Sequence, residues 1–583
     1  MSNKLTYLFA GLLIITMFAG AFFSMTEDSL TYDELAHIPA GYSYLTQQDY
    51  RVNPEHPPLL KGIAALPLLF LNLNFPLEDQ TWIQDSAPAW WVQFDLGTKF
   101  LYGSGNSPTE IIFWSRIPMI LLTLLLGLFV FKWARKLAGN EAALAVLAIF
   151  CFSPTILANG RLVTTDVGAA FGAVLATYFW LKFLPEPKAK NIILAALGFG
   201  IALLCKFSLV LLVPFFAIIT IVYALLFSNN QKMKNLLSYA LKAILIGVLA
   251  MVFVVGPIYQ LVLQNYPPEQ QKRDTVSDLG QGGMQILKNA DIWMADKPLL
   301  RPFSQFFRGI LMAGQRTIFG NTVYFLGEVS TSAWWYYFPT IFLLKESLPF
   351  LLICLTALIG SILLMRRGFS LRQWIKNNFT LFSFIVFIAI YWLAAVLGNL
   401  NIGIRHLLPT FPFIFILAVL GLKTIIDRSR GKIRKILLSL SAILFLWHIG
   451  SSVSAFPHYI SYYNELVGSD TGYKYAVDSN YDWGQDFYRL LVFVEKNNIE
   501  KINLDYFGGE NPEYWLKDKY VRLKPKEITE PPKGWVAVSV NELQRGIADP
   551  VPGFNQETGY YNWLKDKEPV AKMGYSIFVY YID

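Results

Sequence analysis

Long apolar runs separated by short polar connections dominate this chain. A helix needs roughly twenty apolar residues to cross a bilayer, and about eleven stretches approach that length. They fall near 5–25, 111–131, 140–158, 167–184, 191–206, 208–227, 238–260, 338–364, 379–398, 407–426 and 436–455. The pattern therefore predicts a mainly α, polytopic membrane protein, although the division between the fifth and sixth runs stays open.

Composition supports this class and excludes others. Of 583 residues, 54% are hydrophobic and 15% charged, a combination that soluble domains rarely reach. The net charge of +8 comes from basic residues gathered in short loops, which argues against a nucleic-acid partner. The three cysteines lie in or beside apolar runs, so neither a disulfide nor a zinc motif is expected. No GxGxxG motif follows a strand, so we expect no nucleotide-sugar fold.

The distribution of lysine and arginine predicts the orientation. Basic residues follow every second run, for example Lys132 and Arg135 after the second and Arg428 and Arg430 after the tenth. Short basic loops face the cytoplasm. The amino terminus is then cytoplasmic and the carboxyl terminus extracytoplasmic. A cleavable signal peptide is the rival interpretation of residues 1–25, but the apolar run is long for one.

Three polar regions fall on the extracytoplasmic side. Two are external loops, 26–110 and 261–337, within a transmembrane domain that spans residues 1–455. The third is the tail, 456–583, which we expect to form a small extracytoplasmic α/β domain. Its pattern predicts one helix at 484–498, with Asp482 as the cap. It also predicts three strands, at 502–507, 535–540 and 575–581.

One ionisable cluster lies directly after the first apolar run. Asp33-Glu34-Leu35-Ala36-His37 is followed by Asn53-Pro54-Glu55-His56-Pro57-Pro58-Leu59-Leu60-Lys61. Ionisable groups at a membrane boundary are costly and favour a functional site. The simpler alternative is a solvated loop, in which Thr31 and Glu34 form a capping box.

This cluster resembles the protein O-mannosyltransferase and aminoarabinose-transferase superfamily of GT-C glycosyltransferases, in particular its bacterial members. Four later segments share the resemblance, in the expected order: Gly160 to Asp166, Tyr337-Phe338-Pro339 with Lys345, Asn401 to Pro409, and Asp478 to Asp486. The resemblance implies a GT-C-like helical bundle and a polyprenyl-phosphate sugar donor. It also implies a single inverting displacement.

Seven residues are candidates for the chemistry that the resemblance implies. Asp33 matches the acidic residue that accepts the proton of the acceptor hydroxyl. Glu34 and Asp166 are further acidic candidates, although Glu34 could cap a helix and Asp166 could cap the fourth run or pair with Arg161. Cations should stabilise the departing phosphate. The candidates are Lys61, Arg405, Lys206 and Lys345, of which the last two could instead snorkel to the interface.

The remaining candidates surround the same face without an assigned role. They are His37, Glu55, His56, Arg161, His406, Asp478, Asn480 and Asp482. The three histidines could hold a divalent metal with Glu55 and Asp166, but their spacing fits no standard site. The metal therefore stays unknown and no cofactor is assigned. Asp478 to Asp482 fails the EF-hand pattern, because Trp483 stands where glycine is needed.

The sequence thus predicts a hexosyl- or pentosyltransferase in the bacterial cytoplasmic membrane. It would pass a sugar from a polyprenyl-phosphate donor to a protein, lipid or glycan acceptor on the extracytoplasmic face. The alternative is a transporter or flippase for a lipid-linked glycan, which would place its site near the membrane midplane. A third alternative is a sensor whose tail binds a ligand.

Overall fold

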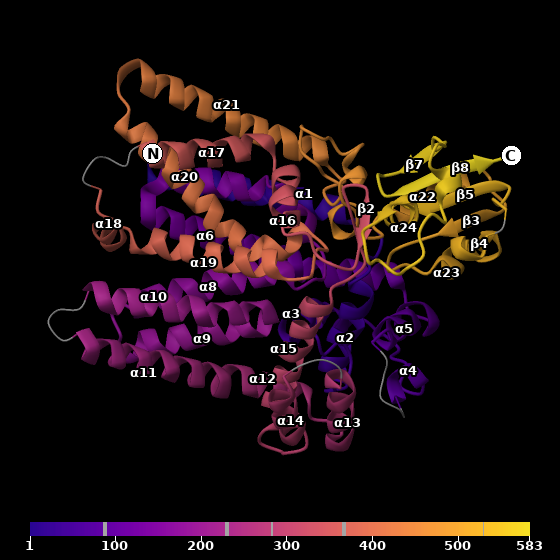
Figure 1. The fold of residues 1–583 in the computed structure, drawn as a ribbon, viewed down its shortest axis with the longest axis horizontal. Helices are drawn as coiled ribbons and strands as arrows, with labels where there is room; N and C mark the ends of the chain where they lie inside the picture. Colours follow the sequence, from indigo (N-terminus) through magenta and orange to yellow (C-terminus); the bar gives the residue numbers. More distant parts are fainter. Residues whose placement is uncertain (85–89, 228–231, 281–283, 364–368, 529) are drawn as a thin grey trace.

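Long helices run side by side through most of the molecule, and a small sheet lies at one end (Figure 1). The structure is a computed structural model that describes residues 1–84, 90–227, 232–280, 284–363, 369–528 and 530–583. The amino terminus lies at the end of the bundle opposite the sheet (Figure 1). The predicted class, a mainly α bundle with a small C-terminal α/β region, is confirmed.

Seven helical segments of the described residues are long and apolar enough to cross a membrane. They are α1 (Asn3–Met25), α6 (Pro108–Cys151), η3 with α10 (Phe207–Leu211, Leu212–Phe227), α11 through η4 to α12 (Lys232–Ala250, Met251–Val255, Gly256–Val262), α19 (Phe379–Leu397), η5 with α20 (Ile404–Thr410, Phe411–Arg428) and α21 (Gly431–Ala455). An eighth forms if α16 (Tyr337–Lys345) and α17 (Leu348–Leu363), which meet at 115°, count as one bent span. The protein is therefore an integral membrane protein.

Gly139 divides the 44 residues of α6 into two helices. Its φ of 86° is accessible to glycine but strained for other residues, so the chain turns there. The returning part runs back along the first, since a Cβ at Gly127 would lie 2.9 Å from the ring of Phe150. The predicted run 111–131 lies in the first part, and the run 140–158 covers the second part and continues into α7 (Pro154–Asn159).

Two further helices belong to the bundle. These are α8 (Asp166–Phe183) and α9 (Ala189–Cys205), which pack against each other. Because α9 is shorter than a typical span, the number of about eleven stays a prediction. The last residue of the predicted run 338–364 lies outside the described residues.

Both external loops fold into short helices at the end of the bundle nearer the sheet (Figure 1). The first holds α2 (Glu34–Thr46), α3 (Pro58–Ala65), η1 (Leu66–Phe70), α4 (Gln80–Ile83), α5 (Val92–Thr98) and η2 (Lys99–Gly103). The second holds α13 (Pro268–Leu279), α14 (Gln285–Met294) and α15 (Arg301–Phe319). A Cβ at Gly41 would lie 2.1 Å from the carbonyl oxygen of Lys61, so α2 and α3 pack backbone to backbone.

The C-terminal sheet has five strands in the order β4-β3-β5-β8-β7. They are β3 (Ile502–Asp505), β4 (Tyr520–Arg522), β5 (Gly534–Ser539), β7 (Ala571–Met573) and β8 (Ile577–Ile582). Strand β3 pairs in parallel with β4 and β5, whereas β8 is antiparallel to β5 and β7. The helices are α22 (Phe487–Lys496), α23 (Pro512–Leu516) and α24 (Val540–Ile547). The predicted helix and three strands are confirmed within a few residues.

A second, three-stranded sheet joins an external loop to the C-terminal region. Strand β2 (Glu328–Ser330) pairs with β1 (Val323–Phe325) and with β6 (Asp549–Pro550). The remaining short helices complete the chain: α7 (Pro154–Asn159), α18 (Leu371–Asn377), η6 (Gly472–Lys474), η7 (Asp478–Asn480), η8 (Lys517–Lys519), η9 (Pro525–Glu527) and η10 (Asn562–Leu564).

The predicted cap of the tail helix is wrong. Helix α22 begins at Phe487, and Asp486 precedes it without a side-chain capping bond. Asp482 is buried instead, and its carboxylate accepts hydrogen bonds from the backbone N–H groups of Gly484 and Asn541. It therefore ties the segment before α22 to the start of α24.

Candidate active site

A cavity of about 620 Å³ lies where the external loops meet the C-terminal region. Its lining includes apolar residues from η3, α15 and α19, such as Val210, Leu211, Ile310 and Ala395. It also includes the ionisable side chains Asp33, His37, Glu55, His56, Lys206, Arg316, Arg405, His406, Asp478 and Arg545. The cavity can therefore hold a molecule with an apolar portion and a polar portion.

Four side chains of alternating charge form a continuous array beside this cavity. Lys206 donates to Asp166, and Arg405 donates to the other oxygen of Asp166 at 3.1 Å. The same nitrogen of Arg405 also donates to Asp33 Oδ2 at 2.9 Å. Asp33 is 22% exposed while Asp166 is fully buried. Asp33 therefore faces the cavity, and Asp166 holds the two cations from behind.

Arg405 is fixed by the last family-like motif. Its guanidinium lies 4.3 Å over the ring of Trp483, and its Nε donates to Ser479 Oγ at 3.1 Å. Asn480 does not line the cavity, but its Oδ1 accepts from the N–H of Ile404 at 3.0 Å. Two motifs that lie some seventy residues apart in the chain thus form one wall.

Glu34 is held by a buried arginine and does not line the cavity. Arg116 donates to both carboxylate oxygens, at 2.9 and 2.6 Å, and Thr31 N–H adds a bond at 3.0 Å. Burial opposes ionisation, but the Arg116 charge outweighs it and holds the pKa of Glu34 below its usual value. The predicted capping box is wrong in its boundary, because α2 begins at Glu34 and Asp33 stands at its N-cap. The contacts with Arg116 and Thr31 give Glu34 a positioning role.

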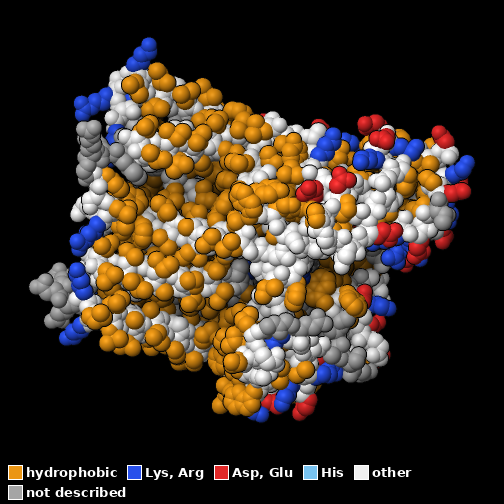
Figure 2. All heavy atoms as spheres, viewed as in Figure 1, with side chains coloured by type: hydrophobic (Ala, Val, Ile, Leu, Met, Phe, Trp, Pro, Cys, Tyr) orange, Lys and Arg blue, Asp and Glu red, His pale blue; other side chains and the backbone are white. Residues whose placement is uncertain are grey.

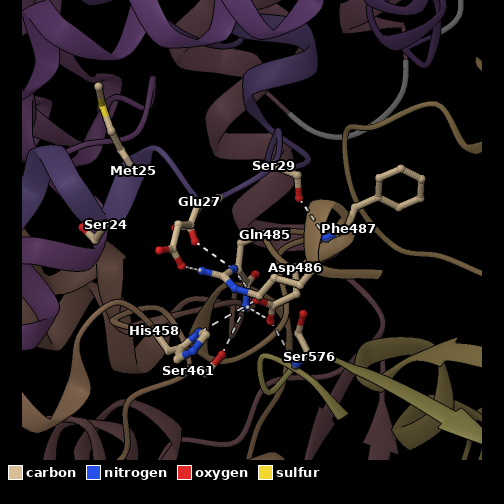
Figure 3. Close-up of polar contacts among 12 residues, drawn as sticks. Ser24, Met25, Glu27, Ser29, His458, Ser461, Gln485, Asp486, Phe487 and Ser576 are labelled. Atoms are coloured by element: carbon tan, nitrogen blue, oxygen red, sulfur yellow. Dashed lines mark hydrogen bonds and ion pairs between the residues drawn. The ribbon is translucent and has the colours of Figure 1, made fainter. Parts of the chain in front are cut away.

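The segment that carries Asp33 is also tied to neighbouring elements. Arg161 donates to Ser24 Oγ and Asp28, so the proposed pairing of Arg161 with Asp166 is wrong. Figure 3 shows the contact with the C-terminal region, where the N–H of Phe487 donates to Ser29 Oγ at 2.9 Å. Asp33 is therefore positioned by the bundle and by the C-terminal region together.

Three histidines line the cavity. Val163 O accepts from His37 Nδ1 at 2.8 Å, so Nε2 of that ring is free to accept a hydrogen bond. The ring of His56 lies 5.0 Å from that of His37. Burial lowers the pKa of His37 and holds that of His56 well below its usual value, so both are neutral at pH 7. His406 Nε2 is buried, with no hydrogen-bond partner in the described part of the chain.

Two of the predicted phosphate ligands lie outside the cavity lining. Lys61 donates to Tyr44 OH, to two oxygens of Asn53 and to His56 O, all within 2.9 Å. Lys345 donates to three backbone carbonyls, including Asn480 O at 2.7 Å. Both ammonium groups hold loops that carry cavity residues.

Sequence reasoning missed two arginines of the lining. Arg316, near the end of α15, donates to Glu55 at 3.0 Å and lies 5.0 Å from the ring of Trp90. Arg545 of α24 lies 3.6 Å from Asp478, whose pKa is raised by burial. A signal for Arg316 existed, because arginines of an external loop run against the cytoplasmic bias of basic residues.

Metal binding gains no support from the geometry. Within the described ranges, no three His, Cys, Asp or Glu side chains come together in a way that could hold a metal ion. His37, His56 and His406 line the same cavity as Glu55, but they face it from different elements.

Comparison with known proteins gives one family match. Residues 110–259 match the model of the dolichyl-phosphate-mannose-protein mannosyltransferase family. This segment is less than half of the chain and includes the Gly160 to Asp166 motif. The match confirms the resemblance inferred from the motifs. No curated protein matches by sequence.

Two solved structures align with most of this chain. ArnT from Cupriavidus metallidurans bound to undecaprenyl phosphate aligns at a TM-score of 0.46 and 11% identity, over 99% of this chain and 98% of that one. The Archaeoglobus fulgidus oligosaccharyltransferase tethered to an acceptor peptide also aligns at 0.46, with 12% identity, over 91% of this chain and 61% of that one. TM-scores below 0.5 have no bearing on function.

Removing the carboxylate of Glu34 should destabilise the fold strongly. In Glu34→Gln the Arg116 charge stays buried without its counter-ion, which typically costs about 3–5 kcal/mol. The melting temperature of detergent-solubilised protein measures the effect. Glu186→Gln, which breaks an exposed pair with Lys188, is the control and should melt like the wild type. A Glu34→Gln protein that melts normally would contradict the positioning role.

Acid should destabilise the protein partly through His56. An unfolded histidine titrates near pH 6.5, whereas the folded His56 resists protonation. Below about pH 6.5 the unfolded state therefore binds the extra proton, and folded stability falls by up to about 1.4 kcal/mol per pH unit. Melting temperatures at about pH 7.5 and 5.5 should differ less in His56→Gln than in the wild type. Asp478 acts in the opposite direction, but equally in both proteins, so an unchanged difference would contradict the assignment.

Proposed function

We propose that this protein transfers a sugar from a polyprenyl-phosphate donor to an acceptor at the extracytoplasmic membrane face. The observation that carries the proposal is a cavity lined by apolar residues and also by Asp33, Lys206, Arg316 and Arg405. A lipid-phosphate sugar combines the same features, with an apolar chain, an anionic phosphate and a polar sugar. The family match over residues 110–259 supports the same class of reaction.

Asp33 is the proposed base. Its Oδ2 accepts from Arg405, and its Oδ1 accepts no hydrogen bond within the described part of the chain. The contact orients the carboxylate, while Oδ1 can take the proton of the acceptor hydroxyl as that oxygen attacks the sugar. The donor phosphate departs from the opposite face, so the displacement inverts the anomeric carbon.

Lys206 and Arg316 are the proposed phosphate ligands, with Arg405 beside them. Both side chains line the cavity next to apolar lining residues, because Phe207 and Ser208 follow Lys206 and Ala313 precedes Arg316 by one helical turn. Preorganised cations stabilise the negative charge that develops on the departing phosphate. His56 and His406, as neutral imidazoles on the same lining, can add hydrogen bonds.

The predicted phosphate contact of Lys61 gives way to an indirect role in this proposal. Its ammonium group donates hydrogen bonds to Asn53 and His56, which lie on one loop. Lys61 therefore positions cavity residues without touching the donor. Lys345 has the same kind of role for the loop of Asn480.

The proposed orientation has a cytoplasmic amino terminus and an extracytoplasmic C-terminal domain, residues 456–583, in a bacterial cytoplasmic membrane. Figure 2 supports it, since on the face shown lysine and arginine side chains gather at the end of the bundle away from the sheet. Clusters of basic residues are typical of the cytoplasmic face. The cavity lies toward the other end, which disfavours a transporter with a site at the midplane.

Asp33→Asn should abolish transfer while leaving donor binding intact. Loss of a positioned base typically costs about 10²–10⁴ in rate. The assay follows cleavage of labelled polyprenyl-phosphate sugars by detergent-solubilised protein, in which no sealed membrane exists. Asp427→Asn, at an exposed pair with Lys423, is the control and should keep full activity. Normal turnover of Asp33→Asn would remove Asp33 from the role, and no cleavage of any donor by the wild type would favour the flippase.

The cation assignment predicts different kinetics for two variants. Arg316→Met should lower kcat by about 10²–10³ and raise the donor KM, because Arg316 contacts the phosphate in both the ground state and the transition state. Lys61→Met should mainly lower the melting temperature, with a donor KM close to that of the wild type. A normal Arg316→Met enzyme, together with a large rise in the donor KM of Lys61→Met, would restore Lys61 as the phosphate ligand.

A further inference from the structure

Helix α14 has its charged and apolar residues reversed relative to a helix on a water-exposed surface. Its buried residues are charged: Lys288 is 3% and Asp291 is 1% exposed. Its large apolar residues face outward: Ile286 is 84% and Trp293 is 59% exposed. A surface helix in water normally turns its apolar face inward. The outward face of α14 therefore needs an apolar environment.

The exposed apolar face extends over both ends of the helix. Met284 precedes α14, and Leu287 lies on its first turn. Leu299 follows in the connection to α15 and is 86% exposed. Together with Ile286 and Trp293 these side chains make a patch of five large apolar residues, which is more than the scattered exposure that monomeric proteins show.

This patch is continuous with the membrane-facing surface of the bundle. The span Lys232–Val262 ends shortly before α13, and its exposed side chains include Phe253 and Leu261. In Figure 1, α13 and α14 lie crosswise to the spanning helices α10 and α11, at the end of the bundle nearer the sheet. Figure 2 shows apolar side chains gathered over this region beside those of the spans, with acidic and basic side chains at its border.

We infer that α14 lies on the bilayer as an interfacial helix and inserts this patch among the headgroups and upper acyl chains of the leaflet on that side. A helix parallel to the membrane plane with an outward apolar face is the arrangement that such binding requires. Tryptophan favours this depth, and Lys272 and Lys297, both about half exposed, can reach the lipid phosphates.

The docked helix is mechanically linked to the cavity. Ser304 of α15 donates to the backbone carbonyl of Asp291 at 3.1 Å, so α14 and α15 are held together. The same α15 carries Ile310, Ala313 and Arg316 into the cavity wall. Contact of α14 with the leaflet would therefore fix the distance of these α15 residues from the membrane surface.

Depth measurement by spin labelling tests this inference without using enzymatic activity. The full-length protein, with Cys151, Cys205 and Cys354 replaced by alanine, would carry a single nitroxide at Leu287→Cys or Leu299→Cys. It would be placed in nanodiscs of phosphatidylethanolamine and phosphatidylglycerol. Both labels should be more accessible to oxygen than to a water-soluble nickel chelate. Glu495→Cys, at an exposed position of α22 in the C-terminal region, is the water-facing control and should favour the nickel chelate.

Two results would overturn the inference. If the labels at residues 287 and 299 are as accessible to the nickel chelate as the label at 495, the patch faces water. If neither reagent reaches them, protein covers the patch, either a second copy of this chain or another partner. Two positions, one on the helix and one in the following connection, keep the test valid should one variant fail to fold. Loss of the proposed transferase activity would leave this readout unchanged.

Discussion

The buried ion pair between Arg116 and Glu34 is the interaction on which the site depends. Arg116 places five hydrogen bonds on Glu34 and on the carbonyls of Met25, Asp28 and Ser29, so one side chain fixes the chain between α1 and α2. Two charges removed from water are costly unless every donor and acceptor is satisfied. Here the cost is offset by satisfying the polar backbone of a segment that crosses from a spanning helix to an external one, and Asp33 follows directly from that segment.

The array Lys206–Asp166–Arg405–Asp33 applies the same principle next to the cavity. Each charged side chain lies beside one of opposite sign, and this attraction offsets part of the cost of removing the charges from water. Asp33 is its exposed end and retains one oxygen without a partner among the described residues. A carboxylate in this position can accept a proton, and cations beside apolar lining residues can receive a lipid phosphate.

The C-terminal region takes part in the site and is more than an appended domain. Arg545 and Phe507 line the cavity, and Trp483 stacks on Arg405. The N–H of Phe487 and the carboxylate of Glu510 bind Ser29 and Leu30, just before Asp33. Strand β6 pairs with the hairpin that follows α15. Contacts of this kind make the geometry of the cavity dependent on the whole chain, which disfavours the interpretation of the tail as a separate sensor.

Hydropathy and local spacing determined the membrane class, the helical bundle and the α/β tail. The family resemblance of the motifs singled out Asp33 and Arg405 as candidates, and ionisable residues near the ends of apolar runs added His56 and Lys206. The sequence could not assign partners. The sequence predicted both Lys61 and Arg405 as phosphate ligands. In the structure the ammonium group of Lys61 donates to Asn53, only eight residues earlier, whereas Arg405 donates to Asp33, which lies 372 positions away in the chain. Arg161 pairs with Asp28 and not with Asp166. Only the tertiary structure showed that Arg316 and Arg545 line the cavity. Charge pairing in a buried site depends on distances between elements far apart in the chain, and only the packing of the helices and the C-terminal sheet sets those distances.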